Sequence, residues 1–254
     1  MLGLCGVVKV INLITLAGEG SRFADLGIET PKPLIEVDGK PMVIQSVSCL
    51  PVSDSYVFVC RSEHIEKYKI HEIIKDYYPN SEFIIVENTT MGQACTAEIG
   101  ILQSSIQNKD SILISCCDYG LEWSNKKYQE IKKDSDVVVW STINNRAFSN
   151  NPSSYSWLET EGTKLIRTHV KQNFFDDPYN NRAIVGTFFF RQAGDFLDGM
   201  SKIYRNDIKS NGEYYIDNIF NSIDHLNVNI FDVNNYNCWG TPEDLRNYEN
   251  KILG

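Results

Sequence analysis

The apolar run from Val7 to Leu16, with the small residues that follow it, constrains the fold of this 254-residue chain more than any other segment. An apolar run bounded by turn residues predicts a buried strand. The stretch Ala17-Gly18-Glu19-Gly20-Ser21 then leaves the backbone open, so that its N–H groups can approach a bound anion. We therefore expect a strand that ends directly at a phosphate-binding loop.

Two cations follow this loop, ten positions apart, and would neutralise a polyphosphate: Arg22 and Lys32. Pro31 and Pro33 fix the backbone around Lys32 and disfavour helix, which suits a rigidly presented cation. The glycines alone are equally consistent with a plain turn. A dinucleotide fingerprint would need a third glycine where the chain has Phe23, and no Walker A loop is present.

Strand-like and helix-like segments then alternate along the chain. We expect strands at 56–60, 83–86, 111–116 and 137–142, and helices at 41–50, 63–78, 92–106 and 125–133. Beyond residue 143 we expect a hairpin formed by 157–158 and 165–170, strands at 184–190 and 228–233, and helices at 193–204, 214–223 and from Thr241-Pro242 onward. This order predicts an α/β protein with a mostly parallel, doubly wound mixed sheet flanked by helices.

Composition excludes several classes of function. A net charge of -9 argues against general nucleic-acid binding, which needs a basic face. No apolar run reaches the roughly 18 residues of a membrane span, and the N-terminus lacks the charged start and cleavage site of a signal peptide. Seven cysteines without a C-x-x-C spacing are typical of free thiols in a reducing compartment. We expect a cytoplasmic protein with no membrane partner, and composition leaves the oligomeric state open.

Asp118 follows an apolar run and so lies where a buried strand ends. The carboxyl ends of parallel strands form the edge at which α/β sheets bind ligands. The alternative is a turn-forming aspartate before Tyr119-Gly120. Asp118 is therefore a candidate functional carboxylate on the same edge as the phosphate-binding loop.

The segments Leu16–Phe23, Thr30–Leu34 and Gly39–Met42 together resemble the signature of nucleotidylyltransferases of the sugar-phosphate type. These enzymes join a nucleoside triphosphate to a phosphorylated small molecule and release pyrophosphate. The resemblance implies a Rossmann-like GT-A-type fold, with Arg22 on the leaving pyrophosphate, Lys32 near the α-phosphate, and Mg²⁺ (or Mn²⁺) on Asp118. It covers nearly the whole chain as a single domain over 1–254, with a nucleotide-binding part over about 1–143 and an acceptor-binding part over about 144–254.

The resemblance also suggests roles for individual residues. Gly92 and Gln93 resemble the segment that lies against the nucleobase, although a simple helix start is the alternative. Lys171 matches the lysine that holds the acceptor phosphate, whereas Val170 stands where the family carries a sugar-binding glutamate. The nucleotide-binding candidates are therefore Leu16, Ala17, Gly18, Gly20, Ser21, Gly92 and Gln93. A second metal-binding acid is expected at position 238, which is Cys238; Asp217, Glu213 or Asp232 could replace it, or Asp118 could act with waters alone.

The missing glutamate favours an acceptor other than a hexose phosphate. The compact chain is similar to enzymes that make CDP-choline or CDP-glutamine for bacterial surface polysaccharides such as capsules, so we expect CTP and a phosphate such as L-glutamine phosphate. Arg182 or Arg146 would bind the carboxylate of that acceptor, and Glu213 or Asp217 its amine. The alternatives are a sugar 1-phosphate enzyme using dTTP or UTP, and a non-catalytic nucleotide sensor. A glycosyltransferase of the same fold would more often carry Asp-x-Asp, but position 120 is Gly.

Overall fold

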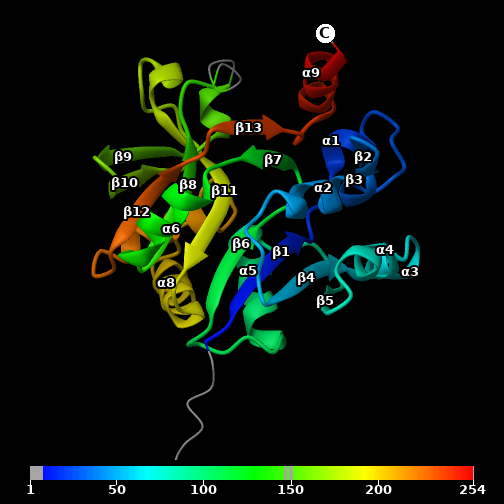
Figure 1. The fold of residues 1–254 in the computed structure, drawn as a ribbon, viewed down its shortest axis with the longest axis horizontal. Coiled ribbons are helices and arrows are strands. Elements are labelled where there is room, and N and C mark those ends of the chain that lie inside the picture. The colour runs from blue at the N-terminus through cyan, green and yellow to red at the C-terminus, as the bar shows by residue number, and fades with distance from the viewer. Residues whose placement is uncertain (1–7, 146–147, 149–150, 254) are drawn as a thin grey trace, which may run out of the picture.

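A computed structural model describes residues 8–145, 148 and 151–253, which form a mixed α/β fold (Figure 1). Val7 and Arg146, both named above, lie outside the described residues. The main sheet has nine strands in the order β5-β4-β1-β6-β11-β8-β12-β10-β9. Their bounds are β1 Val10–Leu16, β4 Ser55–Arg61, β5 Ser81–Val86, β6 Ser111–Ser115, β8 Val137–Thr142, β9 Trp157–Glu161, β10 Lys164–His169, β11 Arg182–Phe190 and β12 Val228–Asp232.

The parallel part of the sheet positions the glycine-containing loop 17–21, which the sequence predicts to bind phosphate. Strands β5, β4, β1 and β6 are parallel to one another. Strand β11 is antiparallel to both of its neighbours β6 and β8, while β8 and β12 are again parallel. Leu16 pairs with Cys60 and Ile14 pairs with Ser115, so β1, β4 and β6 end at the same edge. The segments that follow these three strands therefore meet there.

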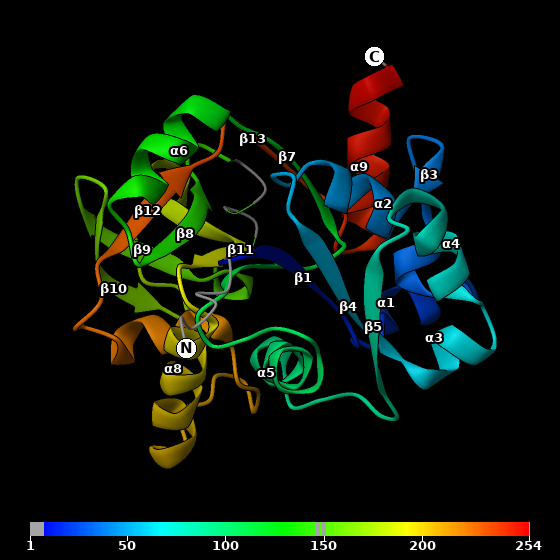
Figure 2. The same cartoon turned by 60° about the horizontal axis from the view of Figure 1, so that its bottom comes forward.

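Helices cover both faces of the sheet. Helices α5 (Gln93–Gln103) and α8 (Ala193–Arg205) lie on one face, and Figure 2 shows them near each other beneath the strands. Helices α2 (Met42–Ser48), α4 (Ile70–Tyr77) and α6 (Asn125–Lys133) cover the other. Strand β1 serves both layers because successive side chains alternate in direction. Leu13 belongs to the α5–α8 core, and Ile14 belongs to the core beneath α2, α4 and α6.

Two expected helices differ from the structure. The segment expected as one helix over 63–78 is divided into α3 (Ser62–Glu66) and α4, because Lys69 between them has φ 52° and lies in the left-handed region. The segment expected at 214–223 is the 3₁₀ helix η4 (Ile216–Ser222). It packs so closely on α8 that a Cβ added at Gly199 would lie 2.3 Å from Ile219 Cγ2. Tertiary packing thus overrides the helical pattern in this segment.

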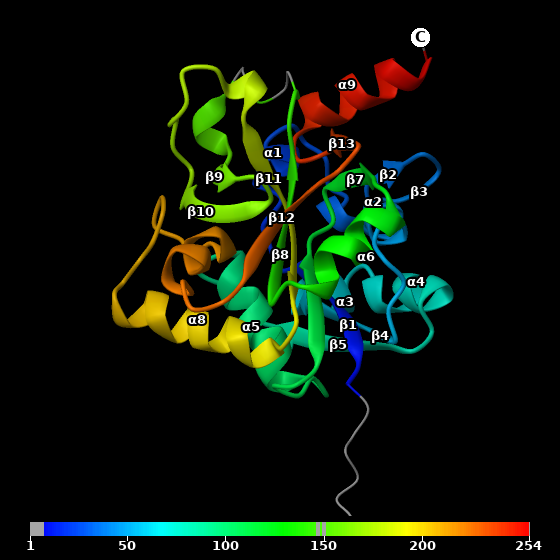
Figure 3. The same cartoon turned by 60° about the vertical axis from the view of Figure 1, so that its left-hand side comes forward.

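A small two-stranded sheet, which the sequence pattern did not predict, carries the chain back to Asp118. Strands β7 (Tyr119–Glu122) and β13 (Asn235–Cys238) are antiparallel, with Cys238 opposite Tyr119 (Figure 3). The Trp239 backbone N–H donates to the Asp118 carbonyl at 2.7 Å. Helix α9 (Pro242–Leu253) follows directly. The C-terminal segment therefore begins beside the end of β6.

The remaining elements are short. They are α1 (Ser21–Ala24), η1 (Lys32–Leu34), β2 (Glu36–Val37), β3 (Lys40–Pro41), η2 (Pro152–Ser154) and η3 (Pro178–Asn180). Among the described residues, no helix combines the length and apolar character that a membrane crossing requires.

Candidate active site

A cavity of about 520 Å³ opens at the edge where β1 and β6 end. The loop after β1 forms one wall, and Gly20, with φ 66°, takes the left-handed turn that starts α1. Cys116, Cys117 and Asp118 form another wall, and the start of α5 a third. Ten of the residues singled out from the sequence line this cavity: Leu16, Ala17, Gly18, Gly20, Ser21, Lys32, Gly92, Gln93, Asp118 and Glu213.

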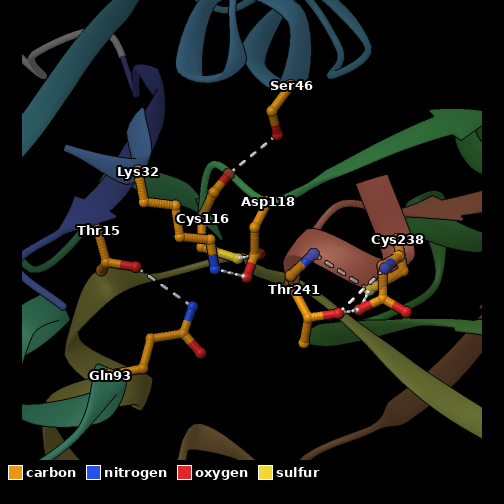
Figure 4. A network of polar contacts seen from close by, with 10 residues as sticks. Thr15, Lys32, Ser46, Gln93, Cys116, Asp118, Cys238 and Thr241 are labelled. Carbon is orange, nitrogen blue, oxygen red and sulfur yellow. Dashed lines mark hydrogen bonds and ion pairs between the residues drawn. The ribbon is translucent and has the colours of Figure 1, made fainter. Parts of the chain in front are cut away.

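Lys32 and Asp118 form an ion pair within this cavity. Lys32 Nζ lies 2.6 Å from Asp118 Oδ2, and both side chains are largely buried (Figure 4). Burial alone would lower the pKa of Lys32, but the Asp118 carboxylate outweighs it and raises that pKa above its usual value. Burial likewise opposes ionisation of Asp118, yet Lys32 holds the pKa of this carboxyl below its usual range. Both residues are therefore charged at neutral pH.

The second oxygen of Asp118 is also bound. The Cys116 thiol donates to Asp118 Oδ1 at 2.8 Å, and the Ser46 hydroxyl donates to the Cys116 carbonyl at 3.0 Å (Figure 4). Burial, and then the negative charge of Asp118, raise the pKa of Cys116 well above its usual value. The thiol therefore stays protonated and acts as a hydrogen-bond donor. This contact fixes the direction of the Asp118 carboxylate.

Cys238 lies close to Asp118, where a second acid was expected. A Cβ added at Gly240 would lie 3.3 Å from Cys238 Sγ, 3.6 Å from Asp118 Oδ2 and 3.8 Å from Asp244 Oδ2. Asp244 accepts hydrogen bonds from the Thr241 hydroxyl at 2.7 Å and from Cys238 Sγ at 3.5 Å. The reciprocal contact from the Asp244 backbone N–H to Thr241 Oγ1 completes a cap at the start of α9. The sequence suggested Asp244 only as a helix-start residue, and tertiary structure brings it to this edge.

The three acids suggested as replacements for position 238 lie in different environments. Glu213 is exposed and lines the 520 Å³ cavity. Asp217 is buried, and burial raises its pKa although the charge of Lys171 opposes this. Asp232 is bound by Arg182. Of the three, only Glu213 faces this cavity.

The donor set suits a magnesium ion that takes most of its ligands from phosphate oxygens and waters. Within residues 8–145, 148 and 151–253, no three His, Cys, Asp or Glu side chains converge as a ready-made metal site. Mg²⁺ requires only one or two protein carboxylates when phosphate oxygens and waters supply its other ligands. The ionised Asp118 carboxylate at the cavity wall meets that requirement.

The segment expected to contact a base begins at Gly92. Gly92 has φ 114°, and a Cβ there would lie 2.5 Å from the Tyr214 carbonyl oxygen. The Tyr214 backbone N–H donates to the Met91 carbonyl at 2.8 Å, and the Ala94 N–H donates to the Tyr214 carbonyl at 3.2 Å. Only glycine allows this close approach. The contact brings Glu213 to the cavity.

Among the expected acceptor residues that the structure describes, only Glu213 lines this cavity. Lys171 has φ 52°, donates from Nζ to the Ser154 carbonyl at 2.7 Å and lies 5.1 Å from the centre of the Tyr215 ring. It also interacts electrostatically with the buried Asp217. Lys171, Tyr215 and Asp217 therefore form a group beside the cavity.

Arg22 is exposed at the start of α1, and its positive charge influences two nearby tyrosines, Tyr215 and Tyr155. Burial, and then the negative charges of Glu213 and Asp217, raise the pKa of Tyr215 to about 12, and Arg22 opposes this shift. Arg22 likewise opposes the raised pKa of Tyr155, which burial and then Cys238 cause. The positive charge of Arg22 therefore acts on both tyrosines, and the sequence reasoning assigned a role to neither. Tyr155 belongs to no motif that could have singled it out, whereas Tyr215 stands between Glu213 and Asp217, two residues that the resemblance did suggest.

The structure does not bring Arg182 to the cavity. Its guanidinium binds Asp232 through two contacts of 2.9 Å, from Nε to Oδ1 and from Nη2 to Oδ2, and its Nη1 donates to Thr160 Oγ1 at 2.8 Å. A guanidinium engaged in this way ties β11 to β12 and β9. Arg182 thus forms an ion pair between strands here, and its expected role in binding the acceptor stays a prediction.

Comparison with solved structures relates this fold to nucleotidyltransferases. The chain is similar to a nucleoside-diphosphate-sugar pyrophosphorylase from Vibrio cholerae, with a TM-score of 0.73 and 18% identity over 94% of this chain and 98% of the other. It is also similar to an inositol-1-phosphate CTP transferase from T. maritima (TM-score 0.70, 13% identity, 98% and 96% covered). An apo UDP-glucose pyrophosphorylase gives a TM-score of 0.70 at 16% identity, with 97% and 98% covered. No protein-family model and no curated protein matches the sequence. The expected GT-A-like fold is therefore confirmed.

Proposed function

We propose that this protein is a nucleotidylyltransferase, which transfers a nucleoside monophosphate from a nucleoside triphosphate to a phosphorylated small molecule and releases pyrophosphate. The observation that carries the proposal is the Lys32–Asp118 ion pair at 2.6 Å, in a cavity whose facing wall is a glycine-rich loop. The pair supplies one cation for phosphate and one carboxylate for a divalent ion. This combination suits phosphoryl transfer, where catalysis consists of positioning and charge neutralisation.

Each residue has a defined task in this proposal. The backbone of Gly18 to Ser21 binds phosphate oxygens, and Lys32 neutralises charge near the α-phosphate. Arg22 binds the leaving pyrophosphate, and Asp118 would hold Mg²⁺ or Mn²⁺, which would supply neutralisation of the phosphate charge. Lys171 holds the acceptor phosphate in line with the α-phosphorus. The reaction needs no general base, since a phosphate monoester has a second pKa of about 6 and is largely ionised at neutral pH.

For the substrates, we propose CTP and a non-sugar phosphate such as L-glutamine phosphate, for surface polysaccharide biosynthesis. The residue before Lys171 is Val170, which is buried and cannot bind sugar hydroxyls. The similar protein from T. maritima is described as a CTP transferase for inositol 1-phosphate. With Arg182 engaged by Asp232, we assign recognition of an acceptor carboxylate to Arg146 and recognition of an amine to Glu213 or Asp217. We assign the nucleotide to about residues 1–143 and the acceptor to about 144–254 of one domain.

A matrix of nucleotides against acceptors tests the proposal, with pyrophosphate release as the readout. CTP, UTP, dTTP, GTP and ATP are each combined with L-glutamine phosphate, phosphocholine, inositol 1-phosphate and glucose 1-phosphate. Release with CTP and a non-sugar acceptor supports the full proposal. Preference for dTTP or UTP with glucose 1-phosphate retains the enzyme class and overturns the substrates.

The alternative function is a nucleotide sensor without turnover. Cys238 in place of an acid, together with the engagement of Asp118 by both Lys32 and Cys116, is the observation that favours it. Calorimetry separates the two functions, because tight binding of nucleotide without pyrophosphate release across the whole matrix indicates a sensor.

A further inference from the structure

A chain of hydrogen bonds links the start of α5 to strands β1 and β6. Gln93 Nε2 donates to Thr15 Oγ1 at 3.3 Å, and Thr15 Oγ1 donates to the Ser115 carbonyl at 3.1 Å. Figure 4 shows the amide nitrogen of Gln93 facing Thr15 and the amide oxygen turned away from it. Thr15 is buried within β1, and both Thr15 and Gln93 line the 520 Å³ cavity.

The chemistry of these groups fixes the orientation of the amide. A carbonyl oxygen can only accept a hydrogen bond, so the Ser115 carbonyl takes the single proton of the Thr15 hydroxyl. Thr15 Oγ1 can then only accept from Gln93. Of the two ends of a glutamine amide, only the nitrogen donates. The nitrogen therefore faces Thr15, and Gln93 Oε1 remains available as an acceptor.

We propose that Thr15 is a specificity-determining positioning residue, which holds Gln93 so that Oε1 selects a nucleobase with an N–H donor on its edge. The inference rests on the proposed nucleotide site and narrows its substrate class. Among pyrimidines, the donor is the exocyclic N4 amino group of cytosine or the ring N3–H of uracil and thymine. If the base edge that faces Gln93 carried only hydrogen-bond acceptors, Gln93 Oε1 would face another acceptor and could form no hydrogen bond with the base.

The position of Thr15 in β1 supports a role beyond packing. Ile11 and Leu13, the preceding residues on the same face, are buried and apolar and belong to the core beneath α5. Thr15 continues this row at the point where the strand reaches the cavity. A valine would fill the same volume without a hydroxyl. The hydroxyl of Thr15, and not the shape of its side chain, therefore sets this position apart from the apolar residues before it in the row.

A double-mutant cycle tests the inference with nucleotide affinity as the readout. Calorimetry without acceptor measures binding of each Mg²⁺-nucleotide to wild type, Thr15→Val, Thr15→Ser, Gln93→Ala and the double variant Thr15→Val/Gln93→Ala. Loss of one oriented hydrogen bond predicts about tenfold weaker binding of the preferred nucleotide to Thr15→Val. We expect Thr15→Ser, which keeps the hydroxyl, to bind within about twofold of wild type. In the Gln93→Ala background, Thr15→Val should cause no further loss.

A nucleotide analogue whose base lacks the N–H donor provides a second, independent test. The triphosphate of pyrimidin-2-one riboside replaces CTP, or N3-methyl-UTP replaces UTP, according to which nucleotide the wild type prefers. Wild type should bind the analogue about tenfold more weakly, and Thr15→Val should bind nucleotide and analogue equally well. Thr15→Ala removes the same hydroxyl and takes the place of Thr15→Val if the latter does not fold.

Three outcomes overturn the inference: unchanged affinity and base ranking in Thr15→Val, an equal loss in the Gln93→Ala background, or no discrimination against the analogue by wild type. The proposed function fails separately. If the protein binds nucleotides in the expected pattern but never releases pyrophosphate, the enzymatic proposal is contradicted while the role of Thr15 is supported. A protein that binds no nucleotide loses both.

Discussion

Lys32 Nζ and Asp118 Oδ2 lie 2.6 Å apart, so the cation from the loop after β1 and the carboxylate at the end of β6 neutralise each other. The two residues are 86 positions apart in the chain. In the proposed reaction, Lys32 must turn from Asp118 to a phosphate, while Asp118 exchanges an ammonium for a metal ion. The ion pair thus keeps both groups charged and in place until a nucleotide supplies a phosphate for Lys32 and a metal ion for Asp118.

Replacing Lys32 by Ala should reduce turnover much more than stability. Removal of one charge-assisted contact to a reacting phosphate typically costs a factor of about 10² to 10³ in rate. The free energy of unfolding should fall by about 1–3 kcal/mol, because Asp118 loses its charged partner in a largely buried place. Pyrophosphate release and urea unfolding measure the two effects. Lys126→Ala, on an exposed position of α6, is the control, and wild-type turnover in Lys32→Ala would contradict the assignment.

Replacing Gly92 by Ala should prevent stable folding or cost more than about 3 kcal/mol. The added Cβ would lie 2.5 Å from the Tyr214 carbonyl oxygen, and φ 114° is strained for any side chain. Gly162→Ala is the matched control, since Gly162 also has positive φ (61°) but open space around it. We expect a cost of about 1–2 kcal/mol there. Thermal and urea unfolding compare the two, and equal costs would show that crowding by Tyr214 is unimportant.

Arg182 and Asp232 should behave as a structural pair. Each of Arg182→Met and Asp232→Asn should lower the free energy of unfolding, with a coupling energy of about 1 kcal/mol for this two-contact, partly exposed pair. KM for the acceptor should remain within about twofold of wild type, because the guanidinium does not line the cavity. A rise in this KM of tenfold or more in Arg182→Met, without a matching rise in Asp232→Asn, would indicate that Arg182 binds the acceptor.

Replacing Asp217 by Asn should stabilise the protein at neutral pH. Burial raises the pKa of this carboxyl above its usual 3.8, although Lys171 opposes the shift. The folded protein therefore keeps this proton at pH values where the unfolded chain has lost it. Stability decreases as pH rises from 3.8 through the raised pKa, and below pH 3.8 the group costs nothing. The gain from Asp217→Asn should accordingly grow between pH 4 and pH 7.

Urea unfolding across that pH range measures this gain. Asp224→Asn, on an exposed position, should show no such trend. A gain for Asp217→Asn that is independent of pH would mean that ionisation is not its cause. If Asp217 also binds the acceptor, the stabilised variant will show a raised KM, which is the usual compromise between stability and function at a site.

Local patterns determined the parallel half of the fold and the core of the site. The apolar run that becomes β1, the small residues after it and the prolines beside Lys32 each express a local preference for burial, turn or extended backbone. Asp118 could be assigned to the ligand-binding edge because strand ends in such sheets share one edge. Gly92 and Gln93 were likewise recognisable at a helix start. These predictions needed no knowledge of which segments lie side by side.

Tertiary structure alone decided the contacts that complete the site. The pairing of β13 with β7 brings Cys238 and Asp244 to Asp118, although the Asn-rich strand β13 has a poor pattern for a strand. Arg182 binds Asp232, 50 positions away, instead of facing the cavity, and Gln93 donates to Thr15, 78 positions away. Such contacts depend on strand register and on how each helix packs against the sheet. Neither is encoded in the local sequence around any one of these residues, because a single segment specifies what its side chains can bind but not which partner the rest of the chain brings to them.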